Sequence, residues 1–181
     1  MANCNAYCGE QLPDHSLIAC EDYSKGGITG FITYDCGSEP ADPSNGVEIA
    51  EIIAAGKAKV VLGIKSDLPE GSEVTVDNPI GCGFPTITLT ADRTLNLIDA
   101  NVNEDNVAFY NGLIGKKIGA LSFYECDSDR ITHISPRGGL TFFGNRIVPA
   151  TNGEIQTFTG QFRWREKNIS NILPAPVGIF E

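Results

Sequence analysis

Basic residues are scarce in this chain. Its 181 residues include 13 Lys and Arg against 23 Asp and Glu, which gives a formal net charge of -10 at pH 7. Proteins that coat nucleic acid need a surface that neutralises phosphate groups. The shortage of cations therefore excludes a protein that wraps DNA, and it predicts no sequence-specific nucleic-acid partner.

Long apolar runs are also missing. The longest, such as residues 58–64, are broken by charges such as Lys59 and fall far short of the roughly 20 residues that a membrane helix needs. The first residues, Met-Ala-Asn-Cys-Asn, contain no basic region followed by an apolar one, so we expect no signal peptide. We predict no membrane partner and synthesis in the cytoplasm.

Histidine, the side chain most often used in general acid–base catalysis, occurs only at His15 and His133. His133 lies between Thr132 and Ile134 in a stretch typical of a strand, which favours a surface or half-buried position. No Gly-x-Ser-x-Gly motif is present to pair it with a nucleophile. The glycine-rich stretches match neither a phosphate loop nor a dinucleotide fingerprint. We therefore predict no catalytic residues, no cofactor-binding residues and no enzyme activity.

Metal sites are weakly indicated. Asp127 and Asp129 could begin a calcium loop, but residues 130–133 lack the further oxygen ligands and the central glycine of that motif. A hairpin turn is the better interpretation. The six cysteines lie mainly in the N-terminal part, with one C-x3-C spacing instead of the two close pairs of a zinc site: Cys4, Cys8, Cys20, Cys36, Cys82 and Cys126. Reduced structural thiols are the preferred interpretation, with disulfides or a metal site as alternatives.

Exposed aromatic side chains could instead stack on sugar rings. Aromatic residues make up only 8% of the chain, and the core needs most of them. The candidates for such a platform are Tyr7, Tyr23, Tyr34, Phe142, Phe143 and Trp164.

Hydrophobic alternation predicts most of the secondary structure. We expect strands over 27–34, 58–64, 73–76, 84–99, 118–125, 130–134, 140–143 and 155–164, with an interruption at 91–93. In the last long strand, Phe158, Phe162 and Trp164 share one face. Asn45 and Glu48 resemble a capping box that opens a helix over 46–55, with Val47 and Ile49 on its apolar face.

A second helix is predicted over 104–113. Asn103 caps it, Val107, Tyr110 and Ile114 form its apolar side, and Gly115 marks its end.

These elements predict a mainly β protein, an antiparallel β sandwich or barrel with two short helices. We divide the chain into an irregular N-terminal arm (1–25), a β domain (26–167) and an extended C-terminal tail (168–181). The tail contains Pro174 and Pro176 and ends in apolar residues. It either folds back on the domain or reaches a neighbouring molecule.

The arrangement resembles the tail tube and related virion structural proteins of tailed bacteriophages. The resemblance is architectural: Gly26-Gly27-Ile28 enters the first strand after a cysteine-bearing arm, a helix over 104–113 is inserted between strands, and a proline-marked tail follows the last strand. In that family a β sandwich or barrel forms hexameric rings around a channel for the genome. The resemblance implies a tail tube subunit made in the host cytoplasm and located in the virion.

The same resemblance implies copies of the chain itself and other virion proteins as partners, and non-adhesive passage of DNA. It places segments 84–99 and 155–164 in the sheet and helix 104–113 outside it, with residues 1–25 and 168–181 reaching neighbours. A capsid accessory or tail connector protein is the alternative within this class. An extracellular β-sandwich carbohydrate-binding module is the alternative from another class.

Overall fold

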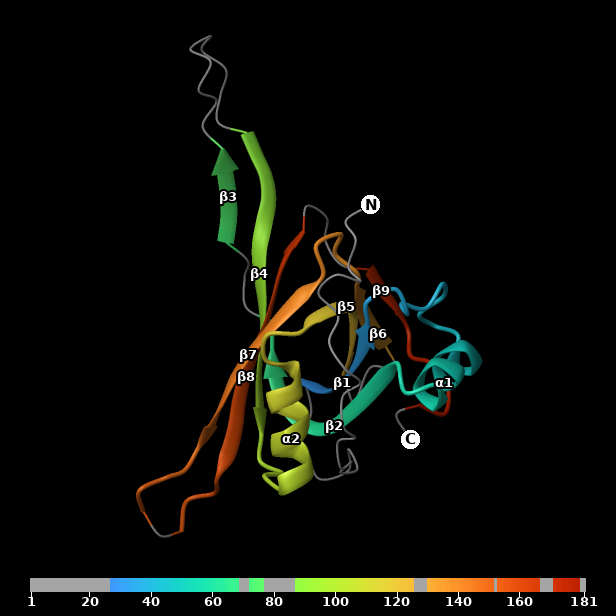
Figure 1. Ribbon diagram of the computed structural model, residues 1–181. Coiled ribbons are helices and arrows are strands. Elements are labelled where there is room, and N and C mark those ends of the chain that lie inside the picture. The colour runs from blue at the N-terminus through green and yellow to red at the C-terminus, as the bar shows by residue number, and fades with distance from the viewer. Residues whose placement is uncertain are drawn as a thin grey trace.

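The computed structural model describes residues 27–68, 72–76, 87–125, 130–151, 153–166 and 171–179. These residues form one nine-stranded antiparallel sheet and two helices (Figure 1). The mainly β, antiparallel fold predicted from the sequence is confirmed. The elements in chain order are β1 (Ile28–Asp35), α1 (Gly46–Ala54), β2 (Ala58–Asp67), β3 (Ser72–Val76), β4 (Ile87–Asp99), α2 (Glu104–Leu113), β5 (Lys117–Glu125), β6 (Arg130–Ile134), β7 (Leu140–Ile147), β8 (Thr157–Glu166) and β9 (Asn171–Pro174).

Strand pairing closes six of the strands into a barrel. The hydrogen-bonded order β1-β2-β4-β8-β7-β5 returns to its start because β5 also pairs with β1. That last ladder runs from Ile28 opposite Glu125 to Asp35 opposite Ile118. Closure pairs each of these strands with a neighbour on both sides over at least part of its length. Strand β6 continues the sheet beside the second half of β5, and β9 pairs with β6.

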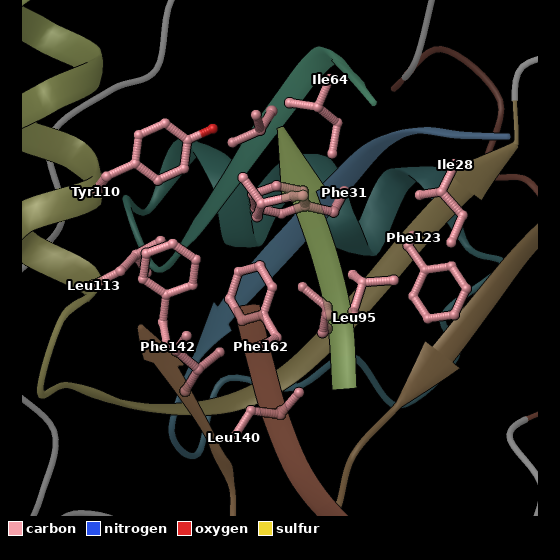
Figure 2. Close-up of a cluster of buried hydrophobic side chains, with 14 of the residues drawn as sticks. Ile28, Phe31, Ile64, Leu95, Tyr110, Leu113, Phe123, Leu140, Phe142 and Phe162 are labelled. Atoms are coloured by element: carbon pink, nitrogen blue, oxygen red, sulfur yellow. The ribbon is translucent and has the colours of Figure 1, made fainter. Parts of the chain in front are cut away.

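Alternate residues of the strands fill the barrel interior (Figure 2). In β8, Phe158, Phe162 and Trp164 are buried, as the alternation predicted. Gly160 shares this face, and a Cβ atom there would lie 2.4 Å from the Phe142 ring. Only glycine therefore leaves room for that ring.

Helix α2 packs against this interior. Its boundaries match the prediction, and the side chain of Asn103 accepts a hydrogen bond from the Asn106 amide at 2.8 Å. The predicted apolar side is only partly right: the buried residues are Asn106, Phe109, Tyr110 and Leu113, whereas Ile114 is exposed. The Tyr110 hydroxyl donates to the buried Asp99 carboxylate at 2.8 Å, and its ring stacks on Phe158 at 4.1 Å between ring centroids. These contacts fix which side of the helix faces the core.

Helix α1 covers a second apolar cluster, on the outer side of the barrel wall. The Asn45 side chain accepts from the Val47 and Glu48 amides, as predicted for a cap. The Glu48 carboxylate, however, accepts from the amides of Ala41 and Asp42 rather than closing a capping box. Ile49 is buried, but Val47 is 71% exposed, which corrects its predicted place on the apolar face.

The C-terminal segment folds back on the barrel in its described part. Its residues 171–174 form β9 beside β6, with Ile131 opposite Leu173. Leu173, Ala175 and Ile179 pack against the cluster under α1. Of the two predicted alternatives, the described residues therefore take the one in which the tail stays on its own domain.

Two predictions about strand limits are corrected. Strand β4 runs through residues 91–93 without interruption, because β3 pairs with it up to Asp92 and β8 pairs with it from Ala91 onward. An irregularity lies earlier in the strand: Leu89 has no partner in the β3 register, between Thr88 and Thr90. Strand β7 extends to Ile147, four residues beyond the predicted limit at Phe143, because β8 pairs with it along this length. The arm at 1–25 and the hairpin turn predicted around Asp127 and Asp129 lie outside the described residues.

Candidate functional site

A serine and a histidine meet inside the sheet. Ser122 on β5 lies opposite His133 on β6, and the Ser122 Oγ atom is 2.8 Å from the His133 Nδ1 atom. Ser122 also donates to the Tyr34 hydroxyl at 3.4 Å. This spacing is typical of a nucleophile and its base. Ser122 and Tyr34 are completely buried, so the serine hydroxyl cannot meet a substrate, and the three groups form an internal hydrogen-bonded network.

His133 is half-buried, as the strand alternation predicted. Burial lowers the pKa of His133, and the negative charge of Glu39 opposes that shift. Burial also raises the pKa of Tyr34 to about 12. Both residues are therefore neutral near pH 7.

His133 should make the stability of the fold depend on pH. Because its pKa is lower in the folded state, the unfolded chain binds more protons, and stability decreases as pH falls below about 6.5. We expect urea unfolding to show a larger loss of stability between pH 7.5 and 5.5 for the wild-type chain than for His133→Gln. Equal losses in the two proteins would contradict this assignment.

Strands β3, β4, β8 and β7 form the most extended feature of the molecule, here called the spine. The β4–β8 ladder pairs residues from Ala91 opposite Glu166 to Asp99 opposite Phe158. Strand β3 extends the spine at one end of this ladder, and the β7–β8 hairpin, with loop residues 148–151 and 153–156, extends it at the other (Figure 1). The two extensions project from opposite ends of the barrel, and α1 lies on the other side of the molecule.

The spine has open strand edges. Among the described residues, β3 pairs only with β4, so its second edge has no strand beside it. On β7, strand β5 pairs only with Leu140 and Thr141, and Ile114 forms a single bridge to Phe142. The segment 143–147 therefore pairs with β8 alone within the described structure. Such edges are templates for pairing with another chain.

Apolar side chains gather around the β7–β8 hairpin. Phe143, Ile147, Val148 and Ile155 are 56%, 46%, 57% and 73% exposed, respectively. The Arg163 guanidinium lies over the Phe143 ring, 5.4 Å from its centroid. We call Ile147, Val148 and Ile155 the hairpin tip. Exposed apolar side chains concentrated along one hairpin favour a contact with another molecule.

A row of polar side chains links two strands of the spine, β4 and β8, to each other and to β2. The Asn96 side-chain amide donates to the Asp67 carboxylate at 3.1 Å, and the Gln161 side-chain amide donates to Asn96 Oδ1 at 2.9 Å. The Arg163 guanidinium donates to Gln161 Oε1 at 2.8 Å. This row crosses β2, β4 and β8. It fixes their positions and gives the spine a defined shape.

The sequence candidates for metal and sugar binding do not assemble in the described residues. No group of three His, Cys, Asp or Glu residues there could hold a metal ion. Cys36 is buried, and its Sγ donates to the Lys117 carbonyl at 3.4 Å; the other five cysteines, His15, Asp127 and Asp129 lie outside the described residues.

The proposed sugar platform is not formed by its described members. Tyr34, Phe142 and Trp164 are buried in the core, and only Phe143 is exposed. Tyr7 and Tyr23 lie outside the described residues.

Within the described part of the chain, neither helix is long and apolar enough to cross a membrane. Comparisons with protein-family models, with curated proteins and with solved structures found no match to this chain.

Proposed function

We propose that this protein is a structural subunit of a bacteriophage particle, a tail tube protein whose copies form stacked rings around a DNA channel. The observation that carries the proposal is the spine, a set of paired strands that extends past the barrel at both ends and has open edges. The extensions project beyond the barrel, so the barrel does not need them to close. A subunit that joins copies of itself would use them.

The open edges provide contacts within a ring. A strand edge exposes a row of amide and carbonyl groups, and a neighbouring copy that adds its own strand satisfies them. The outer edge of β3 and the 143–147 edge of β7 lie at opposite sides of the four-stranded spine. Pairing of one edge with the other is a head-to-tail contact, and such contacts close into rings when the rotation between copies allows it.

The hairpin tip provides a contact between rings. It lies at the far end of the β7–β8 hairpin, where Figure 1 shows the chain projecting away from the barrel. Val148 and Ile155 would lose exposed apolar surface when seated on the next ring. The hydrophobic effect then favours stacking over separate rings.

The negative net charge of the chain is compatible with the passage of DNA through such a tube. Each copy has a formal net charge of -10, and a ring of copies multiplies this charge around a common channel. Phosphate groups are repelled by a negative surface, so DNA passes through without adhering.

Electron microscopy of the concentrated full-length protein tests this proposal. We expect stacked rings or tubes whose amount increases with protein concentration. Salt should promote assembly, because about 0.5 M sodium chloride screens the repulsion between acidic copies. Light scattering on the same samples measures the increase in mass. A monomer at every protein and salt concentration would overturn the proposal.

A further inference from the structure

A surface recess lies beside β8, where its pairing with β7 ends. The β7–β8 ladder stops at Thr141 opposite Arg163, so residues 164–166 pair with β4 on one side only among the described strands. The recess has a volume of about 530 Å³ and is lined by residues of β4, β5 and β8 and by the turn before β7. It is separate from the hairpin tip at the other end of β8.

The charge of the recess is opposite to that of the protein. Its lining includes Arg93, Lys117, Arg163 and Arg165 but only one acidic residue, Asp92. The Asp92 carboxylate is already bound by Arg165 through contacts of 2.6 and 3.1 Å. Among the described residues, neither Arg93 nor Arg163 forms an ion pair. A chain with a net charge of -10 therefore keeps an excess of positive charge in one recess.

Two hydrogen-bond donors at this recess have no acceptor within the part of the chain that the structure describes. Arg93 and Trp164 lie opposite each other in the β4–β8 ladder, and both line the recess. The Nε atom of Arg93 and the Nε1 atom of Trp164 are buried and have no hydrogen-bond partner among the described residues. Trp164 as a whole is only 4% exposed. Buried polar groups are almost always paired in folded proteins, so two neighbouring donors without a partner among the described residues indicate a missing acceptor. The Oε2 atom of Glu166, two residues further along β8, also has no partner there.

We propose that this recess binds an oxyanion, the carboxylate or phosphate group of a ligand. Guanidinium groups suit both because they present several N–H donors in one plane. Arg93 and Arg163 supply the positive charge, although two of the Arg163 nitrogens already donate to Gln161 Oε1. The orphaned donors of Arg93 and Trp164 supply directional hydrogen bonds. This inference does not depend on the proposed role in a tail.

The composition of the chain favours a protein carboxylate as the source of the oxyanion. Each copy carries 23 Asp and Glu residues, so a neighbouring copy brings many carboxylates to the recess. A nucleic-acid backbone is repelled at long range by the net negative charge of the protein. Carboxylates held on an acidic neighbour can enter the recess once other contacts bring the two molecules together.

The intrinsic fluorescence of the full-length protein tests the inference, because Trp164 is its only tryptophan. Poly-L-glutamate and inorganic phosphate are titrated separately, with sodium chloride at matched ionic strength as the control. We expect a saturable change in Trp164 emission that chloride does not produce. A response to poly-glutamate alone identifies a protein carboxylate as the ligand, and a response to phosphate alone identifies a phosphate group.

Variants separate this site from general attraction to the protein. Arg163→Gln replaces an exposed side chain and should weaken binding roughly tenfold, because it removes a charge-assisted contact. Arg130→Gln changes the net charge equally, at an exposed position on β6, and should leave binding unchanged. Arg93→Gln adds a test of the buried donor if the variant folds. The inference is overturned if neither ligand acts beyond the chloride control, or if Arg163→Gln binds as well as Arg130→Gln.

Discussion

Replacing Trp164 with alanine is expected to lower the free energy of unfolding by roughly 3–5 kcal/mol, the cost of removing a large aromatic side chain from a core. Trp164 is 4% exposed and belongs to the main apolar cluster inside the barrel. The neighbouring strands hold their positions through the β4–β8 ladder. They cannot collapse fully into the space that the indole leaves, so most of this cost should be observed.

Trp164→Phe is the matched control. Its ring fills much of the same space, and the indole N–H that it lacks has no hydrogen-bond partner in the described structure. We therefore expect a smaller loss than for Trp164→Ala, because the phenyl ring leaves a smaller cavity. Urea unfolding followed by circular dichroism measures both variants. An unchanged stability for Trp164→Ala would show that the side chain contributes nothing to the core.

Local patterns in the sequence were enough to predict most of the elements. The alternation of Phe158, Phe162 and Trp164 identified the buried face of β8, since period two has a direct meaning in a strand. Asn45 and Asn103 marked the starts of both helices because each accepts the amides of its own first turn. Each of these features depends on residues close together in the chain.

Features that depend on distant residues could not be derived in this way. Closure of the barrel needs β1 to pair with β5, which lies about ninety residues later in the chain. The buried side of α2 is set by the contact of Tyr110 with Asp99, and the sequence pattern alone favoured Ile114. A hydrophobic period shows that one face is buried, but it does not identify the partner of that face.

The candidate site was predicted only in parts. Segments 84–99 and 155–164 were expected in the sheet, but the spine depends on their register with β3 and β7. Val148 and Ile155 lie at or near loop positions, where a single apolar residue does not indicate a binding surface. The basic recess joins β4, β5 and β8, and no sequence motif connects its arginines. The spine and the basic recess both form only when strands distant in the sequence pair with each other.

Assembly should be lost when charges are placed on the hairpin tip. In the double variant Val148→Glu and Ile155→Glu, two carboxylates replace exposed apolar side chains. Stacking would bury these charges against an apolar surface without partners, which is strongly unfavourable. We expect the protein concentration needed for tubes to rise by more than about tenfold, or about 1.4 kcal/mol per contact. The melting temperature should stay close to that of the wild-type protein, because both side chains are exposed in the monomer.

The double variant Val47→Glu and Ile172→Glu provides the matched control for that experiment. It adds the same two negative charges at residues that are 71% and 66% exposed. These positions lie on α1 and β9, away from the hairpin tip (Figure 1). Repulsion between more acidic copies acts equally in both double variants, so only a specific contact at the tip can separate them. Electron microscopy compares the two variants. If both assemble equally, the hairpin tip does not form the stacking contact. If only the control forms tubes, Val148 and Ile155 form that contact.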